Sequence, residues 1–212
     1  MAIAFDAAAS GTVTGTSLTY AHTCSGSNRI LFVGVDVFNP NTDDVTGVTY
    51  GGVAMTQIGT SVAIDVQRDY LYYLINPPTG ANNVVVSKTS SVAIRSASAS
   101  YTDANRLGQP DASGTNSAAT ATSVAKALTT VADNCWMVSF VMNDANTSVV
   151  DTGTTLRGTA AFHAIGDSNG VITPAGSYSM GWKLASGTGD WTISNASFKP
   201  SIDNGSFLLN FC

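Results

Sequence analysis

The sequence predicts an all-β protein, an antiparallel β-sandwich or jelly roll. Ser and Thr together make up 50 of its 212 residues, only 11% are charged and Glu is absent, so strong helix formers other than Ala are scarce. Runs of β-branched and aromatic residues recur about every 8–12 residues between turn residues, as in sandwiches and barrels. These observations exclude a helical bundle or a coiled coil and favour stacked antiparallel sheets.

The individual elements follow from local patterns. Residues 29–38 form a continuous apolar run with many β-branched side chains, which predicts a strand buried on both faces. Residues 45–50 and 53–58 flank Gly51 and Gly52, a hairpin signal, since both glycines can adopt positive φ. The other expected strands are 12–23, 69–75, 83–88, 92–101, 121–131, 135–142, 154–165, 176–185, 190–199 and 207–211.

The organisation of the chain is predicted to be one domain, 1–212. Residues 103–120 are small and polar, and we interpret them as a long surface loop rather than a linker, because neither half shows enough strands for a core of its own. No internal repeat of fixed period is visible, which argues against a propeller or solenoid. Residues 201–212 end in an apolar run, which is either a last core strand or a C-terminal arm that docks onto a neighbouring subunit.

Charge and hydropathy limit the partners. The net charge is −5, and the nine Lys and Arg residues are scattered singly, so we expect no nucleic-acid partner and no binding to an anionic membrane. No stretch reaches 18 apolar residues, and the first residues lack the pattern of a secretory signal. The hydroxyl-rich, charge-poor composition is nevertheless typical of proteins outside cells. A virion protein, made in the host cytoplasm, reconciles these facts; a domain of a longer extracellular or cell-surface protein is the rival interpretation.

Catalytic signals are weak. A nucleophilic hydrolase needs a base beside its nucleophile, and the only histidines, His22 and His163, belong to no known signature. Ser179, between Gly176 and Gly181, lacks the spacing of a nucleophile elbow. The missing Glu removes the commonest acid of a glycosidase. We therefore expect no catalytic residues and no enzyme.

Cysteines and oxygen ligands give no firm cofactor site. Cys24 and Cys135 lie in strand-like runs without a C-x-x-C spacing, so buried thiols are expected, with a disulfide as the alternative; Cys212 ends the chain and is a candidate free thiol. An oxygen-rich segment could bind Ca²⁺, although its spacing is not that of an EF-hand, and we interpret it as an ordinary Asx-rich turn. We expect no metal and no cofactor. The segment contains Asp36, Asn39, Asn41, Asp43 and Asp44.

Three tryptophans are the candidates for sugar stacking. Trp136 belongs to an apolar run and is expected in the core. Trp182 and Trp191 have polar neighbours, so a sugar-binding platform is one interpretation and packing at the edge of the core the preferred one.

Five stretches of the chain carry a resemblance to known proteins: 17–24, 28–35, 45–56, 71–77 and 79–86. Together they resemble a β-sandwich module found in phage virion proteins and in large bacterial surface proteins. The likeness covers about residues 5–142 and is weaker afterwards, where Trp182 and 196–200 are similar to the last strand of the module. Members of that group usually finish near the Lys-Pro of 199–200.

The resemblance implies a non-enzymatic module with no catalytic residues to transfer. Our leading hypothesis is a structural virion protein of a tailed bacteriophage, a capsid decoration (cement) protein that bridges capsid subunits. Its partners would be the major capsid protein or other virion proteins, and self-association, for example as a trimer, would suit the role. The alternative is a carbohydrate- or surface-binding module of a tail fibre or bacterial adhesin. A polysaccharide hydrolase is the third hypothesis, and the lack of Glu disfavours it.

Overall fold

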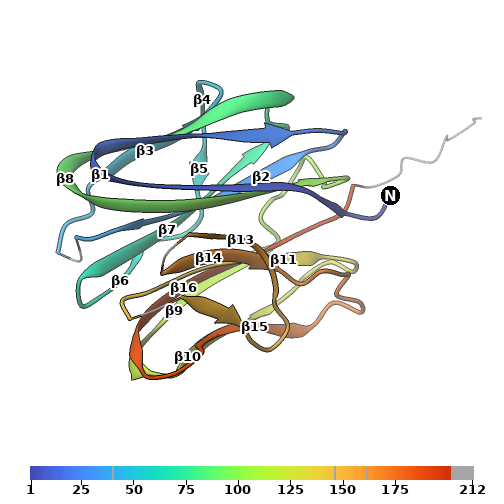
Figure 1. The fold of residues 1–212 in the computed structure, drawn as a ribbon. Coiled ribbons are helices and arrows are strands. Elements are labelled where there is room, and N and C mark those ends of the chain that lie inside the picture. The colour runs from blue at the N-terminus through green and yellow to red at the C-terminus, as the bar shows by residue number, and fades with distance from the viewer. Residues whose placement is uncertain (40, 146, 161, 202–212) are drawn as a thin grey trace, which may run out of the picture.

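The computed structural model describes residues 1–39, 41–145, 147–160 and 162–201, and over these residues the protein consists of strands without a helix (Figure 1). All strand pairs are antiparallel, and the sheets pack face to face, which confirms the predicted all-β sandwich type. Within the described part of the chain, no helix is long and apolar enough to span a membrane.

The first half of the chain, β1 to β8, folds into two layers. Its two longest strands, β1 (Ala4–Cys24) and β8 (Gly80–Thr102), pair along their whole length and bend together, so that each contributes to both layers (Figure 1). Residues 17–24 and 80–87 form the outer layer with β3 and β4, whereas 4–15 and 92–102 form the inner layer with the remaining strands. The remaining bounds are β2 (Ile30–Val37), β3 (Val45–Tyr50), β4 (Val53–Ala54), β5 (Thr56–Gln57), β6 (Val62–Ile64) and β7 (Gln67–Ile75).

The second half, β9 to β16, also forms two layers. The inner sheet has the order β13-β14-β11-β16-β9, and the outer sheet has the order β10-β15-β12. The bounds are β9 (Ala112–Ala121), β10 (Ser123–Thr129), β11 (Trp136–Asn143), β12 (Ser148–Val150), β13 (Thr155–Ala160), β14 (His163–Asp167), β15 (Ser177–Leu184) and β16 (Gly189–Phe198).

The two halves repeat one topology. In the first half β2 pairs with β7 and with the second part of β8; in the second half β11 pairs with β14 and β16 in the same way. The first part of β8 pairs with β3 and the end of β1, as β15 pairs with β12 and β10. The structure therefore contains an internal repeat of one strand topology, although the sequence shows no repeat of fixed period. We refer to this repeat as the duplication.

The inner layers of the two halves pack against each other and bury a shared core. This packing explains why β2 and β11 are buried along their whole length: each lies in a middle layer with sheet on both sides, as predicted for residues 29–38. Each half also has a core between its own two layers. The shared core comprises Ile3, Ile30, Phe32, Ile58, Leu71, Ala97, Ala99, Tyr101, Ala104, Trp136, Val138, Phe140, Ile165, Ala196 and Phe198.

Several predicted boundaries were wrong. The loop expected over 103–120 ends at 111, because β9 pairs with β16 along the edge of its sheet. The strands expected at 83–88 and 92–101 are one bent strand, and the single strand expected over 154–165 is two. The expected strand at 207–211, and the arm expected at 201–212 apart from Ser201, lie outside the described residues.

Candidate functional site

The two candidate sugar-stacking tryptophans are interior residues. Trp182 and Trp191 are both 0% exposed and pack between the two layers of the second half. The indole N–H of Trp182 donates to Ser139 Oγ at 2.9 Å, and that of Trp191 to the Ala121 carbonyl at 2.9 Å. A sugar platform on these residues is therefore wrong. The preferred interpretation, packing in the core, is confirmed, and both rings are fully enclosed rather than at the edge of the core. Trp136 packs in the shared core, as expected.

His22 is the centre of a buried polar network between the layers of the first half. Its Nδ1 lies 2.8 Å from Ser98 Oγ and its Nε2 lies 2.9 Å from Ser100 Oγ. Ser100 donates to Asp6 Oδ2 at 2.8 Å, so its oxygen accepts from Nε2–H of a neutral imidazole. Burial lowers the pKa of His22 to about 4, an effect that the charge of Asp6 only partly offsets. The network joins β1 to β8 and holds the two layers together.

The second histidine and the cysteines are also enclosed. His163 is buried, and its Nε2 lies 3.2 Å from the Ser96 carbonyl, across the junction between the halves. Cys24 and Cys135 are buried free thiols, so the alternative of a disulfide between them is wrong. Burial is the main cause, and the nearby Asp111 the second, of the rise in the pKa of the Cys135 thiol to about 12.

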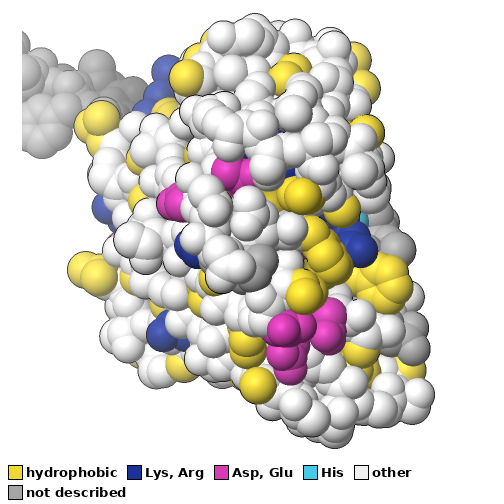
Figure 2. All heavy atoms as spheres, turned by 90° about the vertical axis from the view of Figure 1, so that its left-hand side faces the viewer, with side chains coloured by type: hydrophobic (Ala, Val, Ile, Leu, Met, Phe, Trp, Pro, Cys, Tyr) yellow, Lys and Arg dark blue, Asp and Glu magenta, His cyan; other side chains and the backbone are white. Residues whose placement is uncertain are grey.

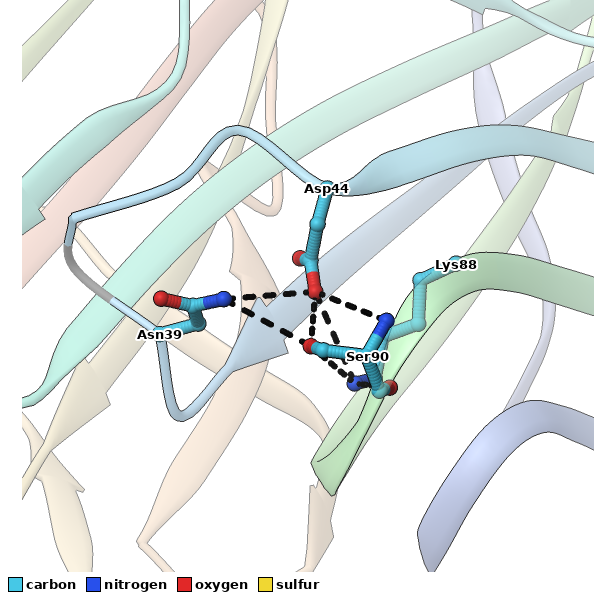
Figure 3. Close-up of polar contacts among 4 residues, drawn as sticks. All are labelled: Asn39, Asp44, Lys88 and Ser90. Atoms are coloured by element: carbon cyan, nitrogen blue, oxygen red, sulfur yellow. Dashed lines mark hydrogen bonds and ion pairs between the residues drawn. The ribbon is translucent and has the colours of Figure 1, made fainter.

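The segment that suggested a calcium loop is divided between separate environments. Asp44 Oδ2 accepts from Ser90 Oγ and from the Ser90 N–H (3.3 Å), receives a long hydrogen bond from Asn39 Nδ2 (3.4 Å), and lies 3.8 Å from Lys88 Nζ (Figure 3). Both side chains of this ion pair are almost fully buried. Burial opposes ionisation, but the hydrogen bonds and Lys88 together lower the pKa of Asp44. The cluster fastens the loop after β2 to the bend of β8.

Asp36, from the same segment, faces the opposite way, into the junction between the halves. It pairs in register with Asp69 of β7, and its Oδ2 lies 3.7 Å from Arg95 NH1. Both carboxyl groups are fully buried, and Thr192 lies beside Asp69. Burial raises the pKa of Asp36 to about 7, and burial together with the charge of Asp36 raises that of Asp69 well above normal. The shared interface thus has an apolar end and a polar end.

Three carboxylates converge at the outer margin of this polar end. Asp65, in the turn between β6 and β7, meets Asp144, which follows β11, and Asp190 of β16; their oxygens lie within 4.8 Å of one another. Figure 2 shows a compact patch of acidic side chains on the lower part of this face, with smaller acidic spots elsewhere on it. Carboxylate oxygens are the ligands that hard divalent cations prefer. This is the group of described residues that could hold a metal.

Two surface hollows among the described residues are shallow or small. A hollow of about 160 Å³ lies at the junction of the halves beside Ile58, Leu71 and Asn195, below the volume of a typical small-molecule site. A more open hollow of about 470 Å³ lies on the outer layer of the first half. It is lined by Thr49, Gly51, Gly52, Ala81, Asn82, Asn83 and Val85.

Sequence reasoning missed the acidic trio because its members come from three distant segments. Each Asp by itself has the pattern of a turn residue, and only the packing of one half on the other brings Asp65 to the remaining two. No family model matches the chain, and no curated protein matches its sequence.

Proposed function

We propose that the protein is a structural virion component of a tailed bacteriophage and acts as a capsid decoration protein. The observation that carries the proposal is the use of its side chains. The histidines, the two described cysteines and the tryptophans are buried and make their contacts inside a stack of four layers. Such a stack is a stiff body whose function would be to occupy a fixed position rather than to transform a ligand.

The composition and the resemblance to phage virion modules support the same role. A hydroxyl-rich, weakly charged surface forms many hydrogen bonds with little dependence on salt. A decoration protein of this kind would lie across joints between capsid subunits and act through many copies, each bound weakly. Self-association, for example as a trimer, would place several such bodies on one capsid site.

The test is quantitative. Mass spectrometry of purified particles is expected to find hundreds of copies of the chain for each particle, and purified protein is expected to bind capsids that lack it. Capsids that already carry the full set are the control and should bind none. A handful of copies for each particle, or unchanged heat resistance of particles without the protein, would refute the decoration role.

A second candidate, a glycan-binding module of a tail fibre or adhesin, is favoured by the hollow of about 470 Å³ on the outer layer. Asn82 and Asn83 border it with amide groups that can recognise hydroxyl groups, and the tryptophans have no part in it. Glycan-array signals that disappear in Asn83→Ala would support this role, since Asn83 is exposed and the change should leave the fold intact. A blank array would contradict it.

A further inference from the structure

The polar end of the shared interface concentrates carboxyl groups. The acidic trio of Asp65, Asp144 and Asp190 lies at the surface, and the fully buried pair Asp36 and Asp69 lies in the same interface. The ion pairs of Lys88, Arg95, Arg157 and Lys183 are made with aspartates outside the trio: Asp44, Asp36, Asp167 and Asp151.

Two of the three carboxylates are already held in place. Asp144 Oδ1 accepts from the Asp190 N–H at 2.8 Å, and Asp190 Oδ1 accepts from the Thr120 N–H at 2.7 Å. Gly189 makes this approach feasible, because a Cβ there would lie 2.9 Å from Asp144 Oδ1 and 2.8 Å from Ala145 Cβ. One oxygen of each carboxylate is thereby oriented by the backbone, which leaves the other free to bind a ligand.

A fully buried amide beside the trio is an independent sign of a missing ligand. Gln67 is 0% exposed, and its Nε2 donates to the Asp190 carbonyl at 3.0 Å, whereas its Oε1 has no hydrogen-bond partner. Through the bond from Nε2, the amide that bears this unpartnered oxygen is fixed beside the backbone of Asp190, a member of the trio. A buried carbonyl oxygen without a partner is costly, and amide oxygens are ligands that Ca²⁺ accepts.

We propose that Asp65, Asp144 and Asp190, with Gln67 Oε1 behind them, form a Ca²⁺ site that joins the two halves of the protein. Asp65 and Gln67 come from the first half, and Asp144 and Asp190 come from the second. A bound cation would remove the mutual repulsion of the carboxylates and add a bond across the interface. Ca²⁺ suits the site because it tolerates irregular sets of oxygen ligands, which Mg²⁺ does not.

The test compares two variants at positions that have the same kind of backbone conformation. Asp65→Asn removes one charge from the trio, and Asp103→Asn is the matched control, since both aspartates have positive φ, where Asn is well tolerated, and Asp103 lies outside the trio. Each protein is melted in a calorimeter with a chelator or with Ca²⁺, at constant ionic strength. Titration calorimetry measures the stoichiometry and the Kd.

Wild type and Asp103→Asn are expected to bind one Ca²⁺ per chain, and their Tm should rise by about 5–10 °C at a Ca²⁺ concentration a hundredfold above Kd. In chelator Asp65→Asn should melt at or slightly above the wild-type Tm, because it removes part of the repulsion within the trio. It should bind Ca²⁺ about tenfold or more weakly. An unchanged wild-type Tm, or an equal rise in all three proteins, would overturn the proposal. Neither outcome depends on whether the protein decorates capsids.

Discussion

The packing of Phe140 on Gly34 is the sharpest test of how the two halves are joined. Phe140 is fully buried in the shared core, and a Cβ built on Gly34 would lie only 2.0 Å from Phe140 Cγ and 2.1 Å from Cδ2. The ring therefore lies directly on the backbone of β2, in a gap that exists only because residue 34 has no side chain. Gly34 is not among the positive-φ residues, so steric overlap alone decides the effect of a substitution.

Three variants follow from this contact. Phe140→Ala should cost about 3–5 kcal/mol, because it leaves a cavity between two rigid sheets. Gly34→Ala should cost about 1–3 kcal/mol, since its methyl group overlaps the root of the ring, which cannot swing away as a flexible chain end would. In the double variant the new methyl group enters the space left by the ring. The loss of stability in the double variant should therefore be about 1–3 kcal/mol smaller than the sum of the losses in the two single variants.

The assay is urea unfolding of the four proteins, with the free energy taken from the midpoint and slope. Gly47→Ala is the control: Gly47 also lies in a strand, but a Cβ there meets nothing within 4 Å, so stability should stay equal or rise by about 0.5–1 kcal/mol. Additive costs for Gly34→Ala and Phe140→Ala, within about 0.5 kcal/mol, would show that the ring does not occupy this position.

Two further predictions concern buried polar groups. Burial and the neighbouring Asp36 raise the pKa of Asp69. Above about pH 4 the folded protein therefore holds a proton on Asp69 that the unfolded chain has lost. The contribution of Asp69 to the free energy of unfolding consequently falls as pH rises. The stability advantage of Asp69→Asn over wild type in urea should therefore grow from pH 4 to pH 8, and a constant difference would contradict this. Ser139→Ala leaves the buried Trp182 indole N–H without its acceptor and should cost about 1–3 kcal/mol in the same assay, whereas an unchanged midpoint would disprove that bond.

The sequence was most informative where burial alone determines the pattern. Residues 29–38 were correctly predicted as a strand with both faces buried, because only a middle layer tolerates an unbroken apolar run. The strand Ala112–Ala121 was missed because its small residues carry no local signal, and its pairing partner β16 lies about 70 or more residues further along the chain. Its structure depends on that distant partner and not on its own propensity.

The sugar-platform alternative for Trp182 and Trp191 failed for a different reason. Their polar neighbours Lys183 and Asp190 suggested an exposed site, but successive side chains in a strand point to opposite faces. A polar residue next to a tryptophan in a strand is therefore compatible with burial of that tryptophan, because the two side chains point to opposite faces. The acidic trio lay beyond sequence reasoning altogether, since its geometry arises only when the two halves dock.

The duplication indicates where a function specific to this protein should be sought. The first residue of β2, Ile30, pairs with Tyr101, and the first residue of the equivalent strand β11, Trp136, pairs with Phe198. Both of these equivalent pairs lie in the shared apolar core.

At the other end of the shared interface, Asp36 paired with Arg95 is equivalent to Met142 paired with Thr192, so the copies differ in chemistry there. A buried carboxyl pair is a poor device for stability, because apolar residues of similar volume would hold the sheets together at less cost. The same end of the interface carries Gln67 and the acidic trio. The apolar end therefore accounts for the cohesion of the two halves, and the polar end, where the equivalent pairs differ, is the place to test for the proposed Ca²⁺ site.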